Sequence, residues 1–198
     1  MSANTLLSGY SFCDLLAYGR EMDQVIARKD GSLLQHSTPE LEHWLNSLPA
    51  ALPRLNGFLL AFVLLFFTLT FASDLLVLIA ALPYTAPPVT AALYFIPVML
   101  FTFANLRAVF LVSRGKTAGL AWFGRVHQVL LCLTAVLLFC SAFAGEKHHV
   151  VMSGVSLALM LLCRIIFNRP GFILFVLYAR TQRIAILARR LRVESYRE

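Results

Sequence analysis

The 198-residue sequence has few charged residues, and it lacks the patterns that form most catalytic and metal sites. Only 14% of its residues are charged, whereas soluble domains contain about 25%. A chain of this length with so few charged side chains cannot form a polar surface that faces water on all sides. A soluble globular enzyme and a disordered tail are therefore both excluded. The four cysteines form neither a CxxC motif nor a Cys/His spacing typical of zinc, so a disulfide scaffold and a zinc site are not expected.

Catalytic motifs are also missing from the sequence. It contains no glycine-rich phosphate loop, HExxH motif, paired carboxylates or nucleophile elbow. His127 and the pair His148-His149 begin different apolar runs, at opposite predicted faces of the membrane, whereas a b-type haem needs two histidines at one depth. We therefore expect a non-enzymatic protein without a cofactor or a bound metal.

Apolar residues are abundant: 59% of the chain is hydrophobic, with 16 phenylalanines. They form four long runs, over residues 57–82, 90–112, 120–144 and 150–167. Each run is close to the roughly 17–25 residues that cross a bilayer as a helix, in which the backbone satisfies its own hydrogen bonds. The sequence predicts an all-α polytopic membrane protein, with four transmembrane helices in two hairpins over residues 55–168.

Two less apolar segments flank this predicted membrane domain. Residues 1–54 are expected to form a cytoplasmic amphipathic segment of two short helices, one over residues 4–28 and one starting at Thr38 with Pro39 in its first turn. Residues 169–198 are expected to form a basic amphipathic helix over 172–193 and a tail. Pro170-Gly171 should bend the chain before this helix, because proline and glycine interrupt helices.

The basic residues predict the orientation. Arg107, Arg114, Lys116 and Arg125 lie in or beside the middle loop, whereas residues 83–90 carry no charge. Residues 164–198 contain eight arginines and two glutamates. Basic loops stay in the cytoplasm, so the sequence predicts that both ends of the chain lie inside. The membrane we expect is the bacterial inner membrane. Anionic headgroups are the expected partner of the basic end, and nucleic acid is not expected.

The basic C-terminal helix admits two interpretations. As a surface helix it would direct arginines toward headgroups or a cytoplasmic partner: Arg180, Arg183, Arg189, Arg190 and Arg192. As an oligomer seam it would pack an a/d stripe, with Arg180 at one core position. That stripe consists of Ile173, Leu177, Ile184, Leu187 and Leu191.

Asp74 is the one charge within the first apolar run, and an ionisable group inside a membrane is a candidate functional residue. Three interpretations are open: an ion- or proton-handling group, a structural partner of Lys147 or His148 at the outer surface, or a plainly exposed interfacial residue.

Four short spans cannot enclose a wide pathway alone, which favours a protein that works in an assembly. We expect an oligomeric scaffold or regulatory subunit that presents cytoplasmic helices to a partner, in an envelope complex or a membrane-acting defence or immunity system. The first alternative is an oligomeric pore or small transporter, with a pathway lined by Asp74, Thr68, Thr70, Thr102 and Asn105. The second alternative is an intramembrane enzyme acting on a lipid-like substrate.

Overall fold

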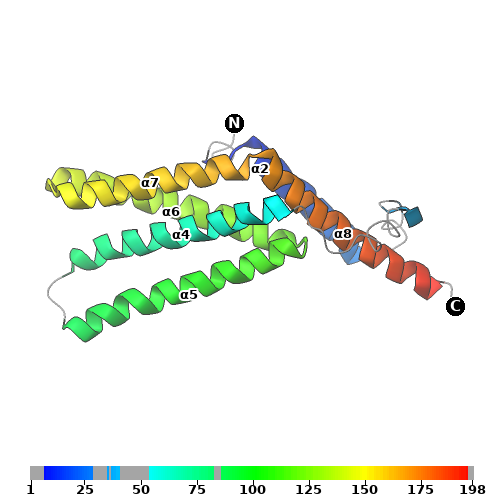
Figure 1. Ribbon diagram of the computed structural model, residues 1–198, viewed down its shortest axis with the longest axis horizontal. Coiled ribbons are helices and arrows are strands. Elements are labelled where there is room, and N and C mark those ends of the chain that lie inside the picture. Colours follow the sequence, from blue (N-terminus) through cyan, green and yellow to red (C-terminus); the bar gives the residue numbers. More distant parts are fainter. Residues whose placement is uncertain (1–6, 29–34, 36, 41–53, 83–85, 196–198) are drawn as a thin grey trace.

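The computed structural model describes residues 7–28, 35, 37–40, 54–82 and 86–195, and this part of the chain contains helices and no strand. Its six long helices are α2 (Tyr10–Arg28), α4 (Arg54–Ala80), α5 (Pro87–Ser113), α6 (Thr117–Ala144), α7 (Lys147–Phe167) and α8 (Pro170–Ser195). Helices α4 to α7 run antiparallel in an elongated bundle, and α2 and α8 leave it at one end (Figure 1). The predicted helical class is confirmed.

Each of the four predicted apolar runs corresponds to one helix, α4 to α7. Pro87 and Pro88 begin α5, and Gly145 ends α6 in the left-handed conformation typical of a helix C-terminus. However, five helices are long and apolar enough to cross a membrane, because α8 also qualifies over Pro170–Glu194. Helix length and composition therefore do not confirm the predicted count of four.

The core of the bundle is formed by α4, α6 and α7, which all contact one another. Each of the three helices has a row of buried residues that recur every three or four positions, the spacing with which helices pack side by side at small angles. On α4 they are Leu60, Val63, Phe67, Thr70, Asp74 and Val77; on α6 Leu120, Phe123, His127, Leu130, Thr134, Leu137 and Ser141; on α7 Ser153, Ser156, Met160, Cys163 and Phe167. The half of the core near α2 and α8 is mainly apolar and aromatic, and the other half carries most of the hydroxyl groups.

Helix α5 packs on the side of this core. Its buried residues are Asn105, Ala108 and Val112, all toward its C-terminal end. Asn105 accepts a hydrogen bond from the Trp122 indole at 3.2 Å, and midway along the helix Phe101 stacks on Phe71 of α4 at 4.2 Å between ring centres. The first half of α5 has no buried residue, and most of its side chains are left exposed by the rest of the described chain.

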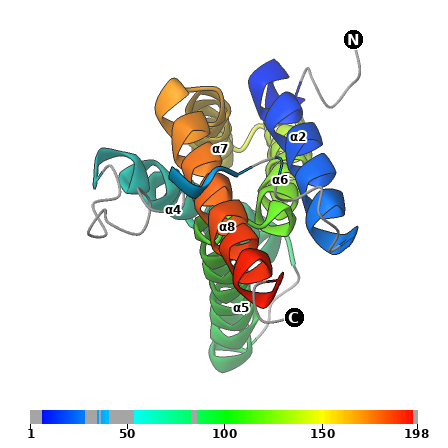
Figure 2. The same ribbon diagram turned by 90° about the vertical axis from the view of Figure 1, so that its right-hand side faces the viewer.

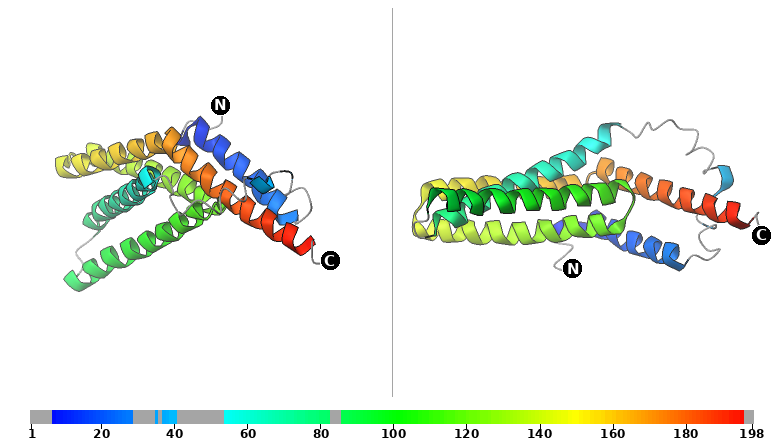
Figure 3. Two further views of the ribbon diagram at one scale, coloured as in Figure 1. Left: turned by 45° about the vertical axis from the view of Figure 1, so that its right-hand side comes forward. Right: turned by 90° about the horizontal axis from the view of Figure 1, so that it is seen from below.

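The predicted interruption at the end of α7 is confirmed. Helix α7 ends at Phe167, Asn168 and Arg169 are not helical, and α8 starts at Pro170. The chain changes direction there, so that α8 extends beyond the bundle end (Figures 1 and 3). Phe167 is fully buried at this corner, with ring contacts to Phe12 of α2, Phe67 of α4 and Phe172 of α8.

Helix α2 runs beside α8 in the same direction (Figure 2), and it contacts both α6 and α8. Its buried residues Phe12, Leu15, Gly19 and Met22 are spaced three or four apart and form one face. The helix predicted from residue 4 starts at Tyr10. Of the second predicted N-terminal helix, Pro39 and Glu40 are helical, and residues 41–48 lie outside the described part of the chain.

Candidate functional site

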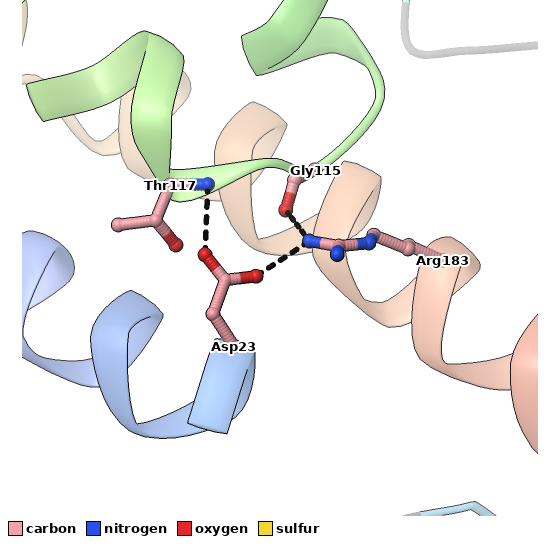
Figure 4. A network of polar contacts seen from close by, with 4 residues as sticks. All are labelled: Asp23, Gly115, Thr117 and Arg183. Atoms are coloured by element: carbon pink, nitrogen blue, oxygen red, sulfur yellow. Dashed lines mark hydrogen bonds and ion pairs between the residues drawn. The ribbon is translucent and has the colours of Figure 1, made fainter. Parts of the chain in front are cut away.

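The most connected polar contacts join α2, the loop between α5 and α6, and α8 (Figure 4). The Asp23 carboxylate on α2 accepts a hydrogen bond from Arg183 Nη1 of α8 at 2.6 Å and one from the Thr117 backbone N–H at 3.3 Å. Arg183 Nη1 also donates to the Gly115 carbonyl at 3.2 Å. The Lys116 side chain makes no capping bond at the start of α6, so Asp23 supplies a negative group where the helix has unpaired N–H groups.

Gly115 permits the loop between α5 and α6 to approach α8 closely. Its φ of +68° is in the left-handed region that favours glycine. A Cβ at this position would also lie 2.5 Å from the Ala179 carbonyl oxygen of α8. The loop is thus held by one close backbone contact and by the Asp23–Arg183 pair.

Arg180 is the buried centre of this junction, with only 3% of its surface exposed. Its Nη1 donates to the Leu15 carbonyl of α2 at 2.6 Å. Its Nε and Nη2 have no hydrogen-bond partner within the described residues. Gly19 packs directly against the guanidinium, and a Cβ there would overlap both Arg180 and the Thr117 hydroxyl. The absence of a side chain at position 19 is what lets α2 and α8 lie this close.

These contacts correct both interpretations of Arg180. A headgroup-facing Arg180 is wrong, and so is an Arg180 facing another copy, because α2 of the same chain covers it. Ile173 and Leu177 pack against the chain's own core, Ile184 is buried, and Leu187 and Leu191 are half-buried. The physical reason is the bend before Pro170, which lays α8 across the bundle end where α2 can cover its apolar stripe.

The other predicted basic residues are divided between internal contacts and exposed positions. Arg183 is paired with Asp23 and half-buried, and Arg192 donates to the Ser37 carbonyl at 2.8 Å. Arg189 and Arg190 are exposed, so these two can meet headgroups or a partner.

Asp74 lies in a second polar cluster, inside the three-helix core. It is fully buried, and its Oδ2 accepts a hydrogen bond from the Thr134 hydroxyl of α6 at 2.6 Å. The Ser156 hydroxyl of α7 faces the same carboxyl group. Asp74 Oδ1 and the Thr70 hydroxyl one turn away have no hydrogen-bond partner within the described residues.

The prediction of a plainly exposed Asp74 is therefore wrong, and its partner is Thr134 instead of Lys147 or His148. Lys147 and His148 are exposed where α7 begins, and the neighbouring His149 pairs with Glu146. The physical reason is that Asp74 lies four residues after Thr70 and three before Val77, on the buried side of α4. Among the described residues, no group of three His, Cys, Asp or Glu could hold a metal ion.

Sequence reasoning missed Asp23 and Gly19. A signal for Gly19 was present, since a glycine in register with Phe12, Leu15 and Met22 on one helix face indicates close approach of another backbone. Asp23 is one of six acidic residues in the first 54, and nothing local distinguishes it.

Comparison with family models, with curated proteins and with solved structures gave no match. The functional argument therefore depends on the two clusters and on the surfaces around them.

Proposed function

We propose that the chain is a non-enzymatic, oligomeric scaffold or regulatory subunit of a membrane assembly, which holds α2 and α8 against the cytoplasmic end of a four-span bundle. The bacterial inner membrane is its proposed location, with both ends of the chain inside. The observation that carries the proposal is the buried hydrogen bond from Arg180 to Leu15. It fixes two helices from opposite ends of the chain as one body, which we call the cap (α2 and α8).

The positions of three arginines support four spans over five. Arg107, Arg125 and Arg164 lie near the cap end of α5, α6 and α7. Between each arginine and the helix end farthest from the cap there are about 17 to 20 residues, or roughly 25–30 Å at 1.5 Å per residue. This length matches the thickness of a hydrocarbon core. The cap then lies outside the hydrocarbon. This placement suits α8, whose arginines would be costly in a fifth span.

The cap offers a mixed surface to a protein partner. On α2, Tyr18 and Glu21 are exposed, and on α8 Ile186, Arg189 and Arg190 are exposed. Aromatic residues and arginine are enriched at protein interfaces. Helices held in place lose little conformational entropy on binding, so this surface suits a cytoplasmic protein better than two free tails would.

The exposed side of α5 is a surface on which a second copy could pack in the proposed oligomer. Large apolar side chains are exposed along it: Phe95, Ile96, Met99, Leu100 and Phe103. Lipid covers such a face in a monomer, and a second copy would cover it in the proposed oligomer.

An ion-handling function is the second candidate, and the observation that favours it is the unpaired Asp74 Oδ1 in the core. Asp74 lies between helices of one chain, so it would not line a central pore between copies. Thr102 and Asn105 bond within their own helix, to Val98 and Phe101. A pathway would therefore run through the interior of each copy.

Photo-crosslinking in cells tests the scaffold proposal. A photoreactive residue at Tyr18 or Ile186 should yield one shared protein adduct, and one at Phe139, which is exposed on the bundle, should not. Arg189→Glu with Arg190→Glu should remove the adduct, and Asp74→Asn should leave it unchanged. The protein mass of the purified particle, after the bound detergent is subtracted, should also be a multiple of the 22.1 kDa of one chain. Adducts independent of position, or an Asp74-dependent ion flux in liposomes without any adduct, would contradict the proposal.

A further inference from the structure

A pocket of about 320 Å³ lies between α2 and the first turns of α6. It is lined by Ser8, Phe12, Cys13, Leu16, Ala17 and Arg20 on the α2 side and by Ala121, Gly124, Arg125 and Gln128 on α6. The two helices are antiparallel here. Gln128 donates to the Ser8 hydroxyl at 3.3 Å at one end, and Gly19 approaches Thr117 at the other. The pocket thus has apolar walls and polar groups of several kinds.

We propose that this pocket binds the phosphate-bearing headgroup of an anionic phospholipid. Arg20 and Arg125 both line it, both are exposed, and no acidic residue is among the described residues that line it. Guanidinium groups bind phosphate oxygens with paired, charge-assisted hydrogen bonds. The Ser8 hydroxyl and the Gln128 amide supply further polar groups for a headgroup.

The position of the pocket matches the depth of a headgroup. This step depends on the proposed membrane placement, but it does not require the scaffold function. Arg125 lies where α6 would leave the hydrocarbon, because about 19 residues of α6 follow it, or roughly 28 Å. Arg20 lies on the cap side. A phosphate between the two arginines would therefore be at the inner surface of the bilayer.

The face of α6 above the pocket suits an acyl chain. Val129, Cys132 and Val136 follow Arg125 at four, seven and eleven positions, so they continue the same side of the helix. All three are exposed. A lipid with its phosphate in the pocket would lay a chain along these residues. Its headgroup would contact both α2 and α6, so the lipid would hold the cap to the bundle.

Native mass spectrometry of the full chain tests this inference. The probes are dioleoyl phosphatidylglycerol, dioleoyl phosphatidylcholine and inorganic phosphate. We expect one phosphatidylglycerol to be retained at least about tenfold more tightly than phosphatidylcholine, since tenfold needs only about 1.4 kcal/mol. Arg20→Gln with Arg125→Gln should remove that preference. The matched control is Arg107→Gln with Arg114→Gln. It removes the same amount of charge from exposed residues at the same end of the bundle but outside the pocket, and it should keep the preference for phosphatidylglycerol.

A second variant separates binding from folding. Ala121→Trp fills the pocket without changing the charge, so it should also release the lipid while the thermal midpoint and helicity stay close to those of the parent. Equal retention of phosphatidylglycerol by all variants would overturn the proposal, because lipid would then adsorb to the general apolar surface. Displacement of the lipid by millimolar inorganic phosphate would also overturn it, by making the pocket a site for free phosphate. Neither result depends on the protein partner of the cap.

Discussion

Arg180 on α8 donates a hydrogen bond to the carbonyl oxygen of Leu15 on α2, across 165 positions of the chain. Both groups are buried, and Gly19 provides the space for the guanidinium. A buried charge is unfavourable unless it is hydrogen-bonded. The hydrogen bond satisfies one donor of the guanidinium and fixes how α2 lies on α8, while Nε and Nη2 have no partner within the described residues.

Gly19→Ala should loosen the cap. The new methyl group overlaps the Arg180 guanidinium and the Thr117 hydroxyl, and such overpacking costs about 1–3 kcal/mol. We expect a lower thermal midpoint in detergent and faster hydrogen exchange in α2 and α8. Gly154→Ala is the matched control, since its Cβ would meet nothing within 4 Å, and it should leave both measurements unchanged or slightly improved.

Asp23→Asn and Arg183→Gln should show a small coupling in a double-mutant cycle. The two side chains are 36% and 24% exposed, so water and salt screen the pair, and we expect about 0.5–1 kcal/mol at low ionic strength. At 1 M salt the coupling should fall, because the screening length shortens to about 3 Å. A coupling that does not change with salt would contradict a screened ion pair and would indicate that the hydrogen bond and packing hold the two side chains together.

Asp74→Asn should preserve the fold. An asparagine carbonyl can accept the Thr134 hydrogen bond, so the loss of stability should stay below about 1 kcal/mol. Asp74→Ala deletes that acceptor and leaves a cavity, so it should cost about 2–3 kcal/mol, and Thr134→Val should cost less. If Asp74→Asn also abolishes a measured ion flux while the protein stays folded, the result would favour an ion-handling function over the scaffold function.

The predicted topology is tested with reporter fusions. A reporter active only in the cytoplasm should work after Glu198 and in the loop at Lys116, and it should fail at Pro87. The loop between α5 and α6, which contains Lys116, is at the cap end of the bundle, and α5 begins at the opposite end with Pro87; Figure 1 shows these two ends. Activity at Pro87 would reverse the orientation and move the cap to the other side of the membrane.

The sequence predicted the four long helices closely, because an apolar run of this length has to satisfy its backbone hydrogen bonds internally. The bend before α8 was also predictable, since Pro170 cannot continue a helix without disrupting it. The extra apolar length of α8 was underestimated. Its first half packs on the bundle as core, with Phe172, Phe175 and Val176 buried, and this gives it the composition of a span.

The two polar clusters were less predictable, for different reasons. Helix α4 is apolar on nearly all sides, so its composition does not indicate which face is buried, although Thr70 and Asp74 are one turn apart on the same stripe. The Asp23–Arg183 pair joins residues 160 positions apart. Only the bend of α8 and the docking of α2 bring them together, and no local pattern contains that information.

The distance between α2 and α8 in a bilayer is the most direct test of the cap. Spin labels at Glu21 and Gln182, both exposed, can be placed in a chain whose four free cysteines have been replaced. Pulsed electron paramagnetic resonance should give one narrow intramolecular distance distribution when labelled chains are diluted with unlabelled ones, and Gly19→Ala should broaden it. A distribution that is already broad in the parent chain would contradict the account, because α2 and α8 would then move independently.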